Sequence, residues 1–144
     1  RLARPACVSV LPLRAMSAAD AVSEARDGKV FQIGGLPSAT AIYDPAANSW
    51  TAGPTPTGFN QADGPSALEP NGKVLAMLSP GLFAGGCKMV EYDPISNSLA
   101  NAPNPPACPG DSSFVGHFML LPTGQVARVL AEEELDRGEA HPLE

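Results

Sequence analysis

The sequence predicts an all-β fold built from repeated units of about four short antiparallel strands. Two near-copies of one sequence motif, which we call the repeated phrase, support this prediction. Residues 43–50 are Tyr-Asp-Pro-Ala-Ala-Asn-Ser-Trp, and residues 92–99 are Tyr-Asp-Pro-Ile-Ser-Asn-Ser-Leu. Sixteen prolines and fourteen glycines fall mostly between short apolar stretches, which is typical of strands joined by turns. The interior apolar positions do not recur at helical spacing, so stacked helix pairs are disfavoured.

Length and charge divide the chain into three segments. The 144 residues, 44% of them hydrophobic, are enough for one domain with a buried core. The net charge of −6 is distributed as +2 over residues 1–26, −3 over residues 27–130 and −5 over residues 131–144. Phosphate backbones require a basic surface, so the middle segment disfavours nucleic-acid binding. No apolar run reaches 18 residues, so we expect no membrane span.

The two end segments differ from the rest. Within the leader, residues 1–26, the alanine-rich stretch Ser17–Arg26 has Ser17 placed to cap a helix and Asp20 at the third helical position. We expect a short helix there, with an unstructured leader as the alternative. For the acidic tail, residues 131–144, we expect a solvated helix or disorder, and we favour less the alternative that it binds a partner.

The middle segment contains the repeat and its strands. Gly-Lys-Val occurs at residues 28–30 and 72–74, and a partial copy, Gly-Gln-Val, occurs at residues 124–126. We expect two-residue hairpin turns at Asp27-Gly28 and Asn71-Gly72. The apolar runs Val74–Leu78 and Phe118–Leu121 predict strands that are covered on both faces.

The period of the repeat indicates the architecture. Gly28 and Gly72 are 44 residues apart, and Tyr43 and Tyr92 are 49 residues apart. A period of about 40–50 residues with four short strands is typical of a β-propeller blade. The sequence therefore predicts two to two-and-a-half four-stranded antiparallel blades, with short helical or disordered ends. Because a blade buries its faces only against neighbours, we expect either self-association through exposed blade faces or a fragment of a longer propeller.

Residues 27–130, which are 104 of the 144, resemble kelch-type repeats of the bacterial galactose-oxidase-like sort. The resemblance rests on Gly-Lys-Val-Phe-Gln-Ile-Gly-Gly at 28–35, on Tyr43 with Trp50, and on Leu-Leu-Pro-Thr-Gly-Gln-Val at 120–126. It implies that the tyrosine and tryptophan pack between blades, and it favours a secreted or periplasmic location. The second copy departs from the pattern because Leu99 replaces the tryptophan.

Candidate catalytic groups are few. Asp111, Ser112, Ser113 and His117 could be written as a Ser-His-Asp set, but no nucleophile elbow is present and nothing places the groups in hydrogen-bond geometry. We therefore assign no catalytic residue, and an enzyme is the less favoured class.

Metal and cofactor sites are also disfavoured. The resemblance suggests copper held by tyrosine and histidine, but Tyr43 and Tyr92 belong to the repeat phrase, and only His117 and His141 are available. The segment Asp44–Asn48 lacks the alternating carboxylates of a calcium loop, so we expect an ordinary turn. We expect no metal and no cofactor.

The three cysteines leave two interpretations open. Cys7, Cys87 and Cys108 form no CxxC pair. A Cys87–Cys108 disulfide is expected in an exported protein, and free buried thiols are the equally favoured alternative.

The favoured function is a non-catalytic binding or interaction module with a protein or glycan ligand. Loops on a rigid scaffold often bind ligands, and Thr55–Asp63 has the composition of an exposed recognition loop. We place ligand contacts on Phe59, Asn60, Gln61 and His117, with an inward-folded Phe59 as the alternative. The alternative function is a fragment of a larger secreted galactose-oxidase-like enzyme or hydrolase whose catalytic residues lie outside this segment. A gene product without a selected role is the third hypothesis.

Overall fold

Antiparallel pairing between chain neighbours organises the molecule, and the all-β prediction is confirmed. The structure, a computed structural model, describes residues 21–24, 28–34, 39–61 and 63–130. These residues form three antiparallel sheets without an α-helix, and a short 3-10 helix, η1 (Ser113–Val115), precedes the last two strands.

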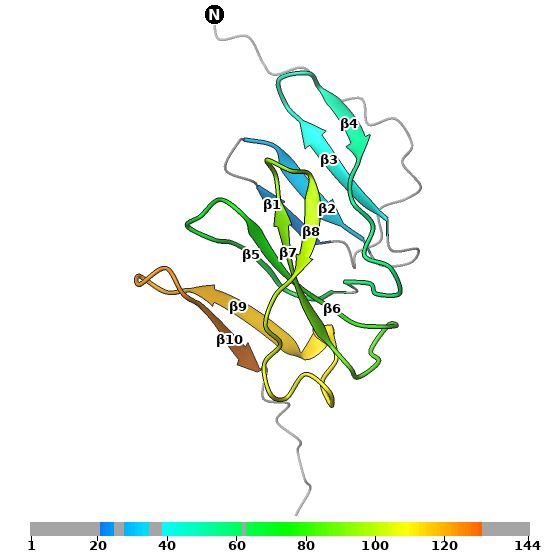
Figure 1. The fold of residues 1–144 in the computed structure, drawn as a ribbon, viewed down its shortest axis with the longest axis vertical. Helices are drawn as coiled ribbons and strands as arrows, with labels where there is room; N and C mark the ends of the chain where they lie inside the picture. Colours follow the sequence, from blue (N-terminus) through cyan, green and yellow to red (C-terminus); the bar gives the residue numbers. More distant parts are fainter. Residues whose placement is uncertain (1–20, 25–27, 35–38, 62, 131–144) are drawn as a thin grey trace, which may run out of the picture.

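The three sheets follow one another along the chain (Figure 1). Sheet 1 contains, in order, β1 (Ala21–Glu24), β2 (Val30–Ile33), β3 (Thr40–Asp44) and β4 (Ser49–Ala52). Sheet 2 contains, in order, β5 (Ser66–Leu68), β6 (Val74–Leu78), β7 (Lys88–Asp93) and β8 (Ser98–Asn101). The terminal hairpin contains β9 (Gly116–Leu120) and β10 (Val126–Leu130). Two successive four-stranded meanders are therefore followed by a two-stranded one.

The repeated phrase forms the same turn in sheets 1 and 2. In sheet 1, the Asp44 carboxylate accepts hydrogen bonds from the amides of Ala46 and Ala47, at 2.9 and 3.2 Å. The Tyr43 hydroxyl donates to Asn48 Oδ1 at 2.9 Å, and Asn48 has a positive φ of 47°. Asn tolerates this left-handed conformation better than most residues, which explains its place in the phrase.

The second copy repeats these contacts in sheet 2. Asp93 accepts from the amides of Ile95 and Ser96, at 2.8 and 3.4 Å. The Tyr92 hydroxyl donates to Asn97 Oδ1 at 3.3 Å, and Asn97 has a φ of 50°. The interpretation of Asp44–Asn48 as a turn is therefore confirmed, because the aspartate of each copy is engaged by its own backbone.

The hairpin expected at Asn71-Gly72 is present, but its turn type differs from the prediction. The amide of Gly72 donates to Glu69 O at 2.9 Å, and the amide of Glu69 donates to Lys73 O at 2.8 Å. Gly72 alone has a positive φ, 88°, so the connection is a type I turn followed by a glycine bulge. Pro70 explains the difference, since its fixed φ suits the second position of a type I turn.

Sheets 1 and 2 pack face to face through one apolar cluster. The rings of Phe31 on β2 and Tyr92 on β7 are stacked, with centroids 3.8 Å apart and an interplanar angle of 4°. Their burial is nearly complete, at 1% and 3% exposed. The other buried members of the cluster are Ile33, Ile42, Val74, Ala76, Leu78 and Val90. Tyr92 therefore packs between sheets 1 and 2.

The opposite face of sheet 2 packs against the terminal hairpin. Its buried cluster includes Leu75, Met77 and Met89, with Phe118 and Val126 of the hairpin against it. Every residue of β6 is therefore buried, which confirms the expectation for Val74–Leu78.

The same expectation for Phe118–Leu121 is wrong. Met119 is 56% exposed and Leu120 is 49% exposed. The physical reason for the exposure of Met119 is that the described chain places a sheet on only one side of the terminal hairpin.

The helix expected over Ser17–Arg26 is wrong for residues 21–24. These residues form β1, which pairs antiparallel with β2 and places Val22 opposite Gln32. The ladder supplied by β2 outweighs the weak helix preference of an alanine-rich stretch. The first repeated unit therefore begins before Asp27, and the rest of the expected helix and the acidic tail lie outside the described residues.

Candidate functional site

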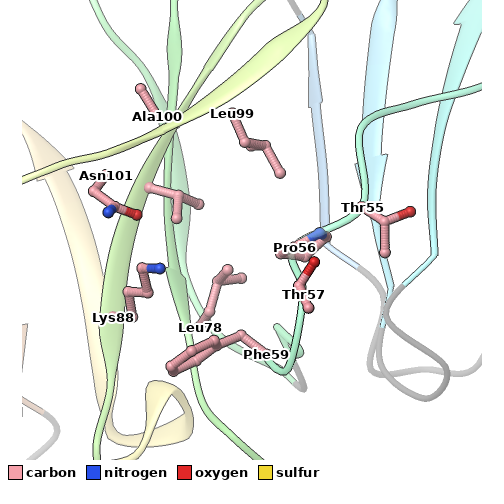
Figure 2. A pocket seen from close by; sticks show the side chains of 10 residues that line it. Thr55, Pro56, Thr57, Phe59, Leu78, Lys88, Leu99, Ala100 and Asn101 are labelled. Carbon is pink, nitrogen blue, oxygen red and sulfur yellow. The ribbon is translucent and has the colours of Figure 1, made fainter.

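A cleft opens between sheet 2 and the loop that joins sheet 1 to it (Figure 2). We call it the inter-sheet cleft, and its volume is about 230 Å³. It is lined by Thr55, Pro56, Thr57, Phe59, Leu78, Lys88, Val90, Leu99, Ala100 and Asn101. The lining thus combines hydroxyl, amide and ammonium groups with an apolar floor.

Strand alternation places the sheet 2 side chains of the cleft, except that of Ala100, on one face. In β7, Lys88 has the same parity as Val90, which is buried against sheet 1. In β8, Asn101 lies opposite Val90, and Leu99 lies opposite Tyr92. Residues 53–61, which connect β4 to β5, supply the facing wall.

Lys88 and Phe59 contact each other across the cleft. The Lys88 ammonium lies 5.0 Å from the centroid of the Phe59 ring, within the range of a cation–π interaction. Phe59 is half-buried and packs against the apolar cluster between the sheets. Phe59 therefore belongs to the cleft, although it is less exposed than the loop composition predicts.

Asn60 and Gln61 are not exposed, contrary to the prediction. Asn60 is 4% exposed and Gln61 is fully buried at 0%. The amide of Asn60 donates to Ser79 O at 2.7 Å, and the Gln61 side-chain amide donates to Gly64 O at 2.8 Å. Because the loop carries backbone polar groups into the interior, the Gln61 side chain and the backbone of Ser79 pair with them.

The buried loop also connects to the segment before the terminal hairpin. The Ser113 hydroxyl donates to Gln61 O at 2.7 Å, and the Ser113 amide donates to Ser79 Oγ at 2.5 Å. Ser113 is 1% exposed, so its hydroxyl is engaged in the interior.

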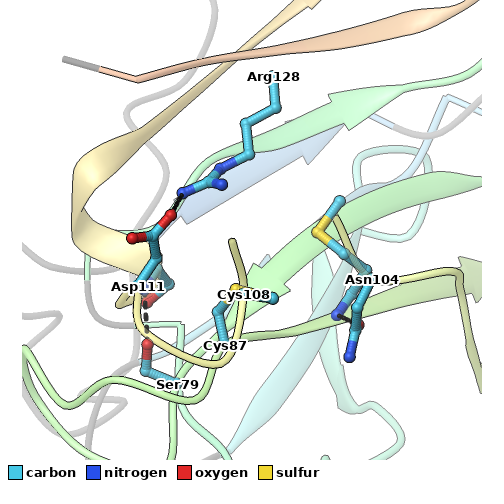
Figure 3. Close-up of a disulfide and its surroundings, with 8 residues drawn as sticks. Ser79, Cys87, Asn104, Cys108, Asp111 and Arg128 are labelled. Carbon is cyan, nitrogen blue, oxygen red and sulfur yellow. Dashed lines mark hydrogen bonds and ion pairs between the residues drawn. A yellow bond between two sulfur atoms is a disulfide. The ribbon is translucent and has the colours of Figure 1, made fainter. Parts of the chain in front are cut away.

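His117 lies apart from the cleft, exposed on β9. It pairs across the hairpin with Val129, on the face that points away from the sheet 2 contact of Phe118. The Asp111 carboxylate is engaged by Arg128 at 2.7 Å (Figure 3). The structure therefore does not bring Asp111, Ser113 and His117 together as a catalytic set.

Cys87 and Cys108 form a disulfide, which resolves the two interpretations of these cysteines (Figure 3). Their Cα atoms are 4.8 Å apart, and the bridge spans 21 residues. The Cys87 amide donates to Cys108 O at 2.9 Å and to Asp111 O at 3.1 Å. The bridge thus fixes the long β8–β9 connection to the start of β7.

A second hollow, which we call the β10 groove, lies between sheet 2 and the terminal hairpin. Its volume is about 380 Å³. Its walls are Glu69, Leu75, Met89, Glu91, Ala102, Pro103, Asn104, Pro105, Phe118, Val126 and Arg128. Among the described strands, β10 pairs only with β9, so the groove runs beside a sheet edge.

Two ionisable groups of the described residues have displaced pKa values, and both belong to the scaffold. The hydrogen bond with Glu91 raises the pKa of Lys73. The backbone amide of Ile95 lowers the pKa of Asp93 by stabilising the carboxylate. Neither group lines the inter-sheet cleft.

Comparison with known proteins assigns no family to this chain. No protein-family model matches it, and no curated protein matches it. In the described ranges, no three metal-binding side chains of His, Cys, Asp or Glu gather. The same part of the chain holds no helix with the length and apolarity to cross a bilayer.

Proposed function

We propose that this chain is a non-catalytic binding module built from kelch-like propeller blades, and that the inter-sheet cleft is its ligand site. The observation that supports the site is the concave surface between sheet 2 and the loop that joins sheet 1 to it, which presents Lys88 and three polar side chains beside an apolar floor. Ligand sites are commonly concave and mainly apolar, with a few placed polar groups.

The repeat geometry supports the propeller component of the proposal. Sheets 1 and 2 have the same strand order and the same Tyr-Asp-Pro turn, and they stack face to face. Strand β5 lies beside both β1 and β9, so the first strands of the three sheets are neighbours (Figure 1). Such neighbouring first strands are expected when blades are arranged around a common axis.

The binding component is tested by glycan arrays and pull-downs with a variant that fills the cleft. Thr57 is exposed on the rim, so Thr57→Trp should abolish ligand capture without unfolding the protein. Thr123→Trp, at the exposed turn of the terminal hairpin, is the matched control and should bind normally. A ligand captured equally by both variants would show that the cleft is not the site.

Self-association is part of the same proposal. Met119, Leu120 and Val129 expose 56%, 49% and 46% of their surface on the terminal hairpin. Met119 and Val129 lie on the same face of the hairpin, the face that points away from sheet 2, and exposed apolar side chains that gather on one face mark contact surfaces. Light scattering should give a mass above the 14.8 kDa of one chain, rising with concentration. Met119→Glu should return the mass toward that of one chain, and a wild-type mass of 14.8 kDa throughout would refute self-association.

A second candidate is a segment of a larger secreted galactose-oxidase-like enzyme or hydrolase. The buried Cys87–Cys108 disulfide favours a secreted or periplasmic location, because such bridges persist in oxidising compartments. The β10 groove also leaves room beside an edge strand for further strands. An adjoining reading frame with further Tyr-Asp-Pro repeats would support this candidate, and one without them would count against it.

A further inference from the structure

Lys88 is the unneutralised cation of the described chain. The other described cations are paired with carboxylates, in the pairs Lys29–Asp44, Lys73–Glu91 and Arg128–Asp111. No carboxylate oxygen of the described ranges lies within 4.0 Å of Lys88 Nζ. Within the described ranges, this positive charge in the cleft is thus left without a carboxylate counter-charge.

The Phe59 ring holds this charge at the cleft without using its hydrogen-bond donors. The ring centroid lies 5.0 Å from Nζ, and a ring face attracts a cation through its quadrupole. An ammonium has three N–H donors, and the ring contact leaves them available to oxygen atoms. Lys88 can therefore bind an anionic group while the ring remains in place.

The rest of the cleft fits a hydroxylated ring better than a bare anion. Thr55, Thr57 and Asn101 provide donors and acceptors, and Leu78, Val90 and Leu99 form the apolar floor. A sugar ring has an apolar face and a rim of hydroxyls, which this combination complements. The volume of about 230 Å³ lies below the range usual for drug-sized ligands, so it suits a single sugar unit.

We propose that the inter-sheet cleft binds a sugar unit that carries a carboxylate, that is, a uronate. Lys88 contacts the carboxylate, and Thr57 and Asn101 bind ring hydroxyls. The inference rests on the proposed binding function and specifies its ligand class.

Calorimetric titration of the full chain with three probes tests this assignment. Glucuronate carries both the ring and the charge, glucose carries the ring alone, and propionate carries the charge alone. Glucuronate should bind at least about tenfold more tightly than either of the others, because a charge-assisted hydrogen bond contributes that much or more. Added salt should weaken glucuronate binding, since the partly exposed charge is screened.

Variants of the same chain identify the cation. Lys88→Gln should weaken glucuronate binding about 10- to 100-fold, and Lys88→Arg should retain most of it. Lys29→Gln makes the same charge change at a paired lysine outside the cleft, so it should bind like the wild type. Circular dichroism confirms that each variant is folded.

Each of the following results would overturn the proposal. Equal affinity for glucose and glucuronate would show that the carboxylate is not recognised. Equal affinity for propionate and glucuronate would show that the sugar ring is not recognised. Preference for an acidic peptide over glucuronate would identify a protein ligand. If only neutral glycans bind, and Thr57→Trp abolishes their capture, the cleft function stands while the uronate assignment fails. If no probe, glycan or protein binds, both fail.

Discussion

The stacked pair of Phe31 and Tyr92 provides the most direct energetic test of the packing between sheets 1 and 2. Both rings are almost fully buried, and they lie parallel with centroids 3.8 Å apart. Phe31→Leu and Tyr92→Leu should each lower the free energy of unfolding by about 1–3 kcal/mol, because leucine fills only part of the space that is vacated. Stacked aromatic pairs contribute about 0.5–1.5 kcal/mol beyond burial, so the double variant should show a coupling of that size.

Urea unfolding measures these free energies, with circular dichroism for the strands and fluorescence of the single tryptophan, Trp50, for sheet 1. Tyr92→Phe separates the loss of the hydroxyl bond to Asn97 from the loss of the ring. Tyr43 occupies the same position in the first copy of the repeated phrase as Tyr92 does in the second. It lies on the face of sheet 1 opposite to Phe31, so the effects of Tyr43→Leu and Tyr92→Leu on the free energy of unfolding should be additive. A Phe31–Tyr92 coupling below about 0.3 kcal/mol would refute face-to-face packing at this pair.

Three further perturbations probe the scaffold. Cys108→Ala removes the disulfide and should cost about 3 kcal/mol, and a reductant should lower the Tm of the wild type but not of the variant. Gly64→Ala places a Cβ 2.6 Å from the backbone oxygen of Met77, whereas the nearest atom to a Cβ at Gly81 is 3.6 Å away. Gly64→Ala should therefore destabilise the protein far more than Gly81→Ala, and calorimetry compares the Tm values of the two variants. The folded pKa of Asp93 is lowered, so its stabilising contribution is present above the ordinary pKa of 3.8 and is lost as pH falls through the folded value. When the pH is lowered from about 5 to about 3, the Tm of Asp93→Asn should therefore fall less than the Tm of the wild type. An equal fall in both proteins would contradict this.

The features predicted well from the sequence are those that local chemistry determines. The Tyr-Asp-Pro phrase forms its turn through contacts within five residues, such as the bond from Tyr43 to Asn48. The continuous apolar run Val74–Leu78 is buried on both faces because sheets cover it on both sides. Both features are visible in short windows of sequence.

The features missed depend on partners far along the chain. Residues 21–24 are a strand because β2 pairs with them, which an alanine-rich window does not indicate. Asn60 and Gln61 look like loop residues, yet their segment bonds to Ser79 and Ser113, the latter 52 residues beyond Gln61. Long-range backbone bonds of this kind leave no local pattern.

The sequence did contain a signal for the cleft. Lys88 has the same strand parity as Val90 and Tyr92, which are buried against sheet 1. A lysine on a core-facing position either extends to solvent or meets a specific partner. Its partner on the facing loop, Phe59, is predicted from the sequence as a ligand contact. The contact between Phe59 and Lys88 could not be predicted, because it depends on how the loop and sheet 2 are arranged.

A nuclear Overhauser measurement on the protein in solution tests the arrangement on which the ligand site depends. Cross-peaks should connect the ring protons of Phe31 with those of Tyr92, and the ring protons of Phe59 with the side-chain methylenes of Lys88. If these resonances are assigned and neither set of cross-peaks appears, sheets 1 and 2 do not meet as described, and the inter-sheet cleft does not exist.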